Sequence, residues 1–303
     1  MGNQMFQYAF ALQVLKRNSD HKIVLNGCFH PFSHDKRSLR LQHFDLAKHT
    51  HFCSRPEGYG LILRMMLATF GRMGIRGTFR AFRHIKATLA AHREQLCDAG
   101  LYILTDIYSL PNIRRHSSGG CLHLFGYYQH PQVIRGIEEP LRKAFTVKTP
   151  PSKANQEMLE RIRQDNAVCL HVRRGDYTLL SDTPVCDEAY YRKAVQDACA
   201  KLDHPVFYVF STGHEDVEWV RRHYRFDAEM HYVDLDNPDY EELRLMMACK
   251  HFIIANSTFS WWAAVLSNAA GAAKQVWAPA EWWRGSGINM ALDEWITLRT
   301  DES

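Results

Sequence analysis

The feature that most constrains the fold of this chain is the alternation of short apolar runs with amphipathic segments after residue 150. Three apolar runs, at 167–172, 206–210 and 251–255, have the length and composition of strands buried on both faces. Between them lie segments long enough for the crossover helices that parallel strands require. The pattern predicts an α/β fold with a doubly wound parallel sheet. Helices are expected at 155–164, 190–202, 216–223 and 240–249, with a further short strand at 231–233.

Two adjacent prolines, Pro150 and Pro151, interrupt helical patterning near the middle of the chain. We therefore expect two lobes, at residues 1–150 and 151–303. The pattern of the first lobe is weaker. It is expected to contain a helix at 3–16, a strand at 23–25 and one further helix–strand unit between residues 50 and 110.

The composition excludes a membrane span and a metal-stapled fold. Charged residues interrupt every apolar stretch well before the ~18 residues that a transmembrane helix needs, and no signal peptide is recognisable. We therefore expect the protein in the cytoplasm. The eight cysteines include no C-x-x-C pair, so reduced thiols are expected rather than a zinc site or a disulfide framework.

One segment, residues 61–93, contains seven Lys and Arg residues and no Asp or Glu. Two interpretations fit it: a solvated helical face, or a basic surface that makes peripheral contact with anionic lipid on the inner face of a bacterial membrane. A nucleic-acid interface is not expected, because the chain has no aromatic–basic module.

Polar residues follow the predicted strands at their carboxyl ends, where parallel sheets bind ligands. After the strand at 167–172, which includes His171, come Arg173, Arg174 and Asp176. Guanidinium groups stay charged and fit diphosphate oxygens, which makes this segment a candidate phosphate site. The alternative is an Arg–Asp pair that only holds a loop in place.

A second candidate site lies between the strand at 251–255 and the next helix. Its hydroxyl groups and the backbone N–H groups of a helix start can bind an anion, although an ordinary helix cap looks the same in sequence. Trp261 and Trp262, which follow, are expected in the hydrophobic core. The candidate residues are Asn256, Ser257, Thr258, Phe259 and Ser260.

Together these motifs resemble one family. The chain resembles the α1,2-fucosyltransferases of glycosyltransferase family eleven from its first residues to about residue 283. Its H-x-R-R-x-D element alone is shared with α1,6- and protein O-fucosyltransferases. The matching segments, in order, are residues 2–9 (GNQMFQYA), 126–129 (GYYQ), 171–177 (HVRRGDY) and 249–262 (CKHFIIANSTFSWW).

The resemblance implies a GT-B-like fold of two Rossmann-like lobes whose parallel sheets face a cleft. It implies GDP-fucose as the donor, a galactose-terminated oligosaccharide or glycolipid as the acceptor, inversion at the sugar carbon, and no metal or other cofactor. Residues 151–303 are then the lobe that binds GDP-fucose, and residues 1–150 are mainly the acceptor lobe.

By motif matching, Arg173 is expected to bind the β-phosphate and the departing oxygen, with Arg174 and Asp176 in support. Gly2, Asn3 and Gln4 are expected to face the donor from the first lobe. The other expected donor-binding residues are His171, Asn256, Ser257, Thr258, Phe259 and Ser260.

Two roles stay open at this point. The carboxylate that receives the guanine N–H groups is assigned to Asp216 or Glu215, with helix capping as the alternative for both. The base that takes the acceptor proton is left unassigned; Asp176, Asp182 and Glu188 all lie near the arginine pair in sequence, and Asp182 is named as a first candidate.

An exposed turn is expected at Asp234-Leu235-Asp236 rather than a metal site, although the spacing is that of a D-x-D motif. Two rival functions remain: an α1,6- or protein O-type fucosyltransferase, and a degenerate protein that binds a nucleotide sugar or glycan without turnover. The second is suggested because the family's apolar strand ahead of Gly2 is missing here, as in a shortened chain or a rebuilt sheet edge. A nucleotide-sugar oxidoreductase is not expected, since no G-x-G-x-x-G follows a predicted strand.

Overall fold

The computed structural model of the chain divides into two compact units. Unit 1 consists of Met1 and Asn3–Ala144, and unit 2 of Gly2 and Phe145–Ser303. The structure describes residues 1–26, 39–53, 89–104, 106–117, 120–174, 186–267, 274–283 and 285–299.

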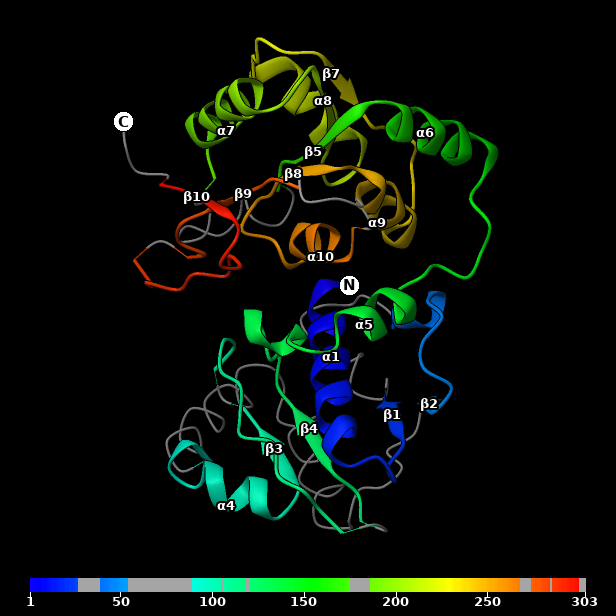
Figure 1. The fold of residues 1–303 in the computed structure, drawn as a ribbon, viewed down its shortest axis with the longest axis vertical. Coiled ribbons are helices and arrows are strands. Elements are labelled where there is room, and N and C mark those ends of the chain that lie inside the picture. Colours follow the sequence, from blue (N-terminus) through cyan, green and yellow to red (C-terminus); the bar gives the residue numbers. More distant parts are fainter. Residues whose placement is uncertain are drawn as a thin grey trace. The chain divides into compact units, whose positions relative to one another are not determined.

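Unit 2 is built on a six-stranded parallel sheet (Figure 1) with the strand order β10-β9-β8-β5-β6-β7. This arrangement confirms the predicted α/β class and the predicted doubly wound sheet. The strands are β5 (Asn166–His171), β6 (Pro205–Phe210), β7 (Met230–Tyr232), β8 (His251–Ile253), β9 (Val276–Pro279) and β10 (Ile296–Leu298).

Helices cover both faces of this sheet. Figure 1 shows α7 and α8 on one side of the strands and α9 and α10 on the other. Ser152 and Asp187 cap the amino ends of α6 and α7 by accepting backbone N–H groups. Trp261 and Trp262 are fully buried in α10, as predicted. The helices are α6 (Lys153–Gln164), α7 (Glu188–Lys201), α8 (Gly213–His223), α9 (Asp239–Ala248) and α10 (Thr258–Leu266).

The strand order reverses between β5 and β8. From β5 the chain adds β6 and then β7 on one side, and it returns to the other side of β5 to add β8, β9 and β10. Loops that leave two strands at such a reversal diverge to opposite faces and leave a crevice at the carboxyl edge, where open α/β sheets bind their ligands. The reversal therefore locates the ligand site at the ends of β5 and β8.

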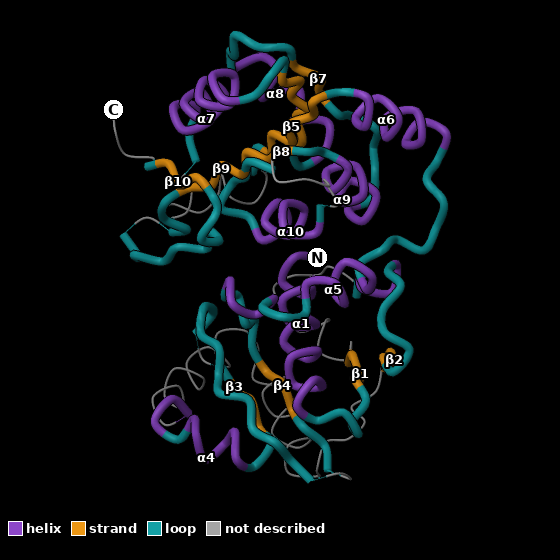
Figure 2. The backbone as a smooth tube through the Cα atoms, in the orientation of Figure 1, coloured by secondary structure: helices purple, strands orange, loops and turns teal. Residues whose placement is uncertain are grey.

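Unit 1 contains a long helix and two short parallel sheets within its described residues (Figure 2). Helix α1 and strand β1 confirm the helix predicted at 3–16 and the strand predicted at 23–25, and α4 with β3 supplies the expected helix–strand unit. Strand β1 pairs with β2, and β3 pairs with β4. The elements are α1 (Gly2–Arg17), β1 (Ile23–Asn26), β2 (Thr50–Cys53), α4 (Arg93–Asp98), β3 (Leu101–Ile103), β4 (His123–Phe125) and α5 (Glu138–Ala144).

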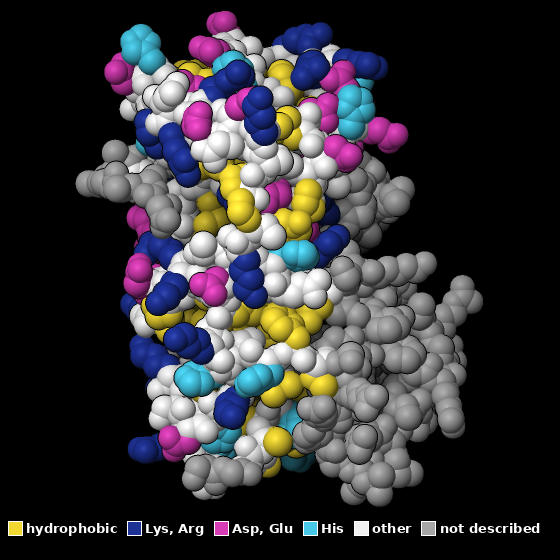
Figure 3. Space-filling view, turned by 90° about the vertical axis from the view of Figure 1, so that its right-hand side faces the viewer, with side chains coloured by type: hydrophobic (Ala, Val, Ile, Leu, Met, Phe, Trp, Pro, Cys, Tyr) yellow, Lys and Arg dark blue, Asp and Glu magenta, His cyan; other side chains and the backbone are white. Residues whose placement is uncertain are grey.

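The proposed membrane contact falls mostly outside the described residues, because 61–88 of the basic segment 61–93 are not described. On the face drawn in Figure 3, Lys and Arg side chains are interspersed with Asp and Glu side chains over unit 2. No helix in the described part of the chain is both long and apolar enough to span a bilayer. Each of the seven cysteines that the structure describes is a free thiol, as expected.

Tyr190 of α7 joins the ends of two strands beside the reversal. Its buried hydroxyl donates a hydrogen bond to the Ile254 carbonyl oxygen at 2.7 Å and lies 3.4 Å from the Trp277 carbonyl oxygen. These carbonyls belong to the carboxyl end of β8 and to β9, so one side chain sets the position of both relative to α7.

We expect Tyr190→Phe to lower the free energy of unfolding by about 1–2 kcal/mol, because the buried Ile254 carbonyl oxygen loses the hydroxyl that donates to it. Urea unfolding followed by circular dichroism measures the change. Tyr127→Phe is the matched control: Tyr127 is 45% exposed, and its loss of a hydroxyl is expected to change stability by less than about 0.5 kcal/mol. Equal effects of the two substitutions would contradict the role given to Tyr190.

Candidate active site

Three loops meet at the carboxyl edge of the sheet, after the neighbouring strands β8, β5 and β6. The Val172 N–H donates to the Phe210 carbonyl at 2.9 Å, which extends the β5–β6 pairing by one residue. The buried Ser211 hydroxyl donates back to the Val172 carbonyl at 2.8 Å. The backbone just before Arg173 is therefore fixed to β6 and its loop through both the N–H and the carbonyl of Val172.

Arg173 carries a permanent positive charge to this edge. Its Nη1 donates a hydrogen bond to the Thr212 hydroxyl at 3.0 Å, in the loop after β6. A guanidinium that is oriented by a neutral hydroxyl keeps its full charge, so it remains able to bind an anion. The role of Arg173 as a phosphate ligand stays a prediction.

Arg174 turns to α8 instead. Its Nε lies 3.4 Å from Asp216 Oδ1, and its guanidinium carbon lies 3.3 Å above the centre of the Trp219 ring. Both Arg174 and Asp216 are mostly buried, so the pair and the stacking hold the loop after β5 against α8. The loop-holding pair considered from the sequence is present, but it is formed by Arg174 with Asp216.

His171 is a buried neutral group at the end of β5. Burial, together with the charge of Arg173, lowers its pKa to about 3, so the imidazole is uncharged at neutral pH. Among the described residues its Nδ1 has no hydrogen-bond partner, and its ring centre lies 6.1 Å from that of Phe259. His171 thus links the β5 end of the crevice to the start of α10.

The start of α10 lies next to His171, at the same edge of the sheet. Ser257 caps the helix, its hydroxyl accepting the Phe259 N–H at 3.3 Å. Asn256 is buried and donates to the Trp282 carbonyl at 3.1 Å, and the Ser260 hydroxyl donates to the Ser257 carbonyl at 3.3 Å. Asn256, Ser257 and Ser260 therefore shape the loop, while Thr258 and Phe259 are partly exposed at the positive end of the helix dipole.

Asn3 and Gln4 bond within unit 1, whereas Gly2, which is grouped with unit 2, is packed so closely against Thr258 that a Cβ would not fit. The Asn3 side-chain oxygen accepts from Gln129 Nε2 at 2.9 Å, and that of Gln4 accepts from the Arg40 N–H at 2.9 Å, both within unit 1. Gly2 is the first residue of α1. Asp176 and Asp182 lie outside the described residues, so their predicted roles are not tested.

The aspartates of the D-x-D sequence lie in an irregular segment after β7. Asp234 Oδ2 lies 2.5 Å from His214 Nδ1, and Asp236 has a left-handed backbone with φ of 48°. A positive φ at Asp is a turn conformation, which agrees with the turn expected from the sequence.

Glu242, in the first turn of α9, is a site residue that the sequence did not reveal. Burial and then the charge of Asp239 raise its pKa to about 7, although the nearby charge of Arg173 opposes the shift. A carboxyl whose pKa is shifted by burial and by neighbouring charges is typical of functional sites. The available signal was its position: α9 begins after β7, at the same edge of the sheet as the loops that follow β5 and β8.

Comparison with known proteins gives a consistent result. The glycosyl transferase family 11 profile matches residues 107–299. The chain is 26% identical to an alpha-1,2-colitosyltransferase of Escherichia coli, over 88% of this chain and 85% of that protein. It is 25% identical to the O-antigen biosynthesis glycosyltransferase WbnK of Escherichia coli, over 98% and 97%. It is 28% identical to the galactoside 2-alpha-L-fucosyltransferase Sec1 of Mus musculus, over 51% and 44%.

The titration of Glu242 can be tested without substrate. Because its pKa is raised in the folded state, the folded protein loses stability as the pH rises from its ordinary value near 4.5 through about 7. Glu242→Gln removes this loss. We expect the variant to gain on the order of 3 kcal/mol of unfolding free energy relative to the wild type between pH 4.5 and pH 8. Urea unfolding at both pH values measures it, and a pH-independent difference would refute the assigned shift.

Proposed function

The chain belongs to glycosyl transferase family 11, and on this premise we propose that it transfers L-fucose from GDP-fucose to the 2-hydroxyl of a terminal galactose, with inversion and without a metal ion. The family expected from the motifs is confirmed, and the chain is a glycosyltransferase. The donor, the acceptor and the stereochemistry are the proposal.

The observation that carries the proposal is the position of Arg173. It follows a central strand at the point where the strand order reverses, opposite the start of α10. A nucleoside diphosphate that leaves the sugar gains negative charge on its β-phosphate, and a fixed cation together with helix N–H groups stabilises that charge as the bond breaks. This supplies the role that a divalent metal has in other sugar transferases.

The reaction then needs one displacement. The acceptor oxygen attacks the anomeric carbon of fucose while the bond from that carbon to the β-phosphate oxygen breaks, and the hydroxyl proton passes to a base. Arg173 binds the departing diphosphate. The bond to the new oxygen forms on the face opposite to the leaving group, which inverts the sugar carbon.

Glu242 is the described carboxyl whose pKa fits a proton acceptor at neutral pH. A second role is also compatible with its position, namely acceptance of the guanine N–H groups of the donor. Asp216, which the sequence offered for guanine, is already paired with Arg174. We therefore propose Glu242 as a carboxylate of the donor site.

The relatives define the donors and acceptors to compare. Colitose is a second candidate donor sugar because the Escherichia coli relative carries it in its name, and galactosides are the candidate acceptors because of Sec1. The rival functions from the sequence, an α1,6- or protein O-type fucosyltransferase and a nucleotide-sugar or glycan-binding protein without turnover, are separated by the same product analysis.

For the chemical step we expect an α1,2-linked product from GDP-fucose and a β-galactoside that persists in EDTA. Arg173→Ala should lower kcat/KM by 10²–10³-fold, roughly the effect of one lost transition-state contact to a developing charge. Arg222→Ala, a highly exposed arginine of α8, serves as the control and should retain activity. A strict metal requirement, or full activity of Arg173→Ala, would sink the mechanism; better transfer from GDP-colitose would change the donor.

Kinetics of Glu242→Gln separate its two roles. Loss of kcat together with loss of the pH dependence near pH 7 is expected if Glu242 accepts the proton. A rise in the KM for GDP-fucose with little change in kcat is expected if it binds guanine. Unchanged kcat, KM and pH profile would remove Glu242 from the donor site.

A further inference from the structure

Contacts of Gly126, Tyr128 and Gln129 hold the turn after β4, residues 126–129, in place. The Gly126 carbonyl accepts from Gln7 Nε2 at 2.9 Å. The buried Tyr128 donates its hydroxyl to the Tyr102 carbonyl at 2.6 Å, and its ring stacks on Phe10 with centres 4.0 Å apart. The remaining partner in this turn is Gln129, which bonds to Asn3 through its side chain and to the Ile107 carbonyl through its N–H.

The turn adopts a conformation that few residues accept. Tyr128 has φ of 53°, in the left-handed region, which costs a bulky residue on the order of 1 kcal/mol or more. A Cβ at Gly126 would lie 2.9 Å from Leu104 Cβ, so a larger residue does not fit there. Such strain persists only where surrounding contacts over-determine the backbone, and it concentrates at ligand sites.

Tyr127 is the side chain that this turn exposes. It is 45% exposed, and Ile107, in the loop after β3, is 37% exposed. Ile103 pairs with Phe125 in the parallel β3–β4 sheet, so both loops leave the same carboxyl edge. The hydrogen bond from the Gln129 N–H to the Ile107 carbonyl, 2.9 Å, holds the two loops together.

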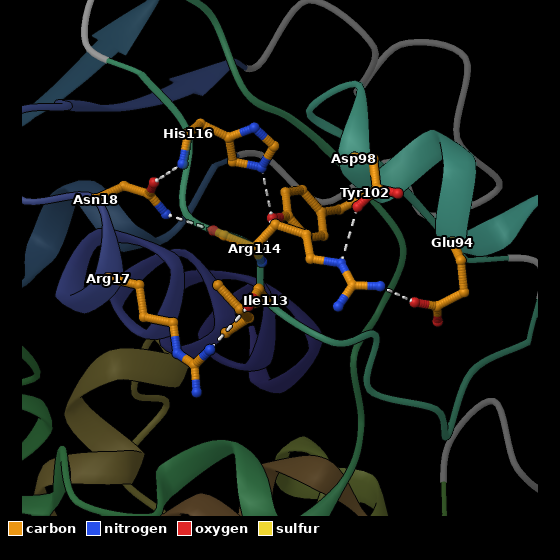
Figure 4. A network of polar contacts seen from close by, with 8 residues as sticks. All are labelled: Arg17, Asn18, Glu94, Asp98, Tyr102, Ile113, Arg114 and His116. Carbon is orange, nitrogen blue, oxygen red and sulfur yellow. Dashed lines mark hydrogen bonds and ion pairs between the residues drawn. The ribbon is translucent and has the colours of Figure 1, made fainter.

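The strand beneath this edge is anchored by a polar network (Figure 4). The Tyr102 hydroxyl of β3 lies 2.9 Å from His116 Nε2 and accepts the Arg114 N–H at 2.9 Å. The Arg114 guanidinium in turn pairs with Glu94 and with Asp98 of α4. The network therefore fixes β3, the strand that pairs with β4 just before the turn that contains Tyr127.

An ion pair lies in the same loop as Ile107. Asp106, next to Ile107 in sequence, lies 3.0 Å from Arg93 Nη2 and accepts the Ser109 N–H at 2.7 Å. Although burial opposes the change, the bonds from Ser109 and the charge of Arg93 lower the pKa of Asp106, so it is ionised at neutral pH. Two partly exposed apolar side chains and an ion pair on these joined loops offer too little apolar area for a stable protein interface.

We propose that Tyr127, with Ile107 beside it, is the platform on which the terminal hexose of the acceptor glycan stacks, and that Asp106 accepts its hydroxyl groups. A pyranose ring has one apolar face of C–H groups and a rim of hydroxyls, which match the aromatic ring and the carboxylate. The inference rests on the proposed function, because it assigns the acceptor of that reaction to the carboxyl edge of β3 and β4.

The test compares three variants in the full chain with lactose as the acceptor. Tyr127→Ala should raise the KM for lactose about fivefold to tenfold, the equivalent of one lost stacking contact, and leave the KM for GDP-fucose unchanged. Tyr127→Phe should stay within about twofold of the wild type, because stacking needs the ring. Phe52→Ala, which removes another exposed aromatic side chain of unit 1, is the control and should have no effect.

An unchanged KM for lactose in Tyr127→Ala overturns the inference. If the wild type transfers sugar to no acceptor, the proposed function fails, and saturation-transfer NMR with lactose decides the subsite separately. Saturation of the galactose ring protons in the wild type that disappears in Tyr127→Ala supports the platform. No saturation of these protons in the wild type, or equal saturation with both proteins, refutes it.

Discussion

Arg173 can bring a fixed charge to the edge of the sheet because the strand before it is central and fully paired. Strand β5 lies between β8 and β6, and its residues are buried on both faces. The bonds between Val172 and the β6 loop continue this pairing to the residue just before Arg173. A charge held on such a backbone needs little reorganisation when an anion forms next to it, which is the condition for strong electrostatic stabilisation.

The neighbouring residues Arg173 and Arg174 have different partners at this edge of the sheet. Arg174 pairs with Asp216 and stacks on the Trp219 ring, so it fixes the loop to α8, whereas Arg173 donates to the Thr212 hydroxyl in the loop after β6. Burial and then the charge of Arg173 lower the pKa of His171 and keep it neutral, whereas burial and then the charge of Asp239 raise the pKa of Glu242 against the opposing charge of Arg173. Burial is thus the main cause of both shifts, and Arg173 affects both groups.

The sequence predicted the central part of unit 2 well, because strands buried on both faces are short continuous apolar runs, and here they alternate with amphipathic segments of helical length. It did not predict β9 or β10. β9 ends in Pro279, and β10 is a three-residue edge strand with little apolar pattern. β9 is an inner strand whose local pattern is obscured by Pro279, whereas the edge strand β10 depends on the neighbour that it joins.

The site was predictable where function follows strand ends and was not where it depends on distant partners. Arg173 and the start of α10 could be placed from the ends of two predicted strands. The sequence could not show which arginine pairs with Asp216. Trp219, which stacks with that arginine, lies 45 residues beyond Arg174 in the chain and meets it only after folding. Glu242 and its neighbour Glu241 look alike in sequence, yet Glu241 pairs with Arg244 while Glu242 has a raised pKa near Arg173.

The measurement that tests the central claim most directly is calorimetric titration of the wild type and Arg173→Ala with GDP and with guanosine, in EDTA. If Arg173 binds the diphosphate, the variant loses at least about tenfold in affinity for GDP, the effect of one charge-assisted bond, and keeps its affinity for guanosine. Equal affinity of both proteins for GDP would contradict the account.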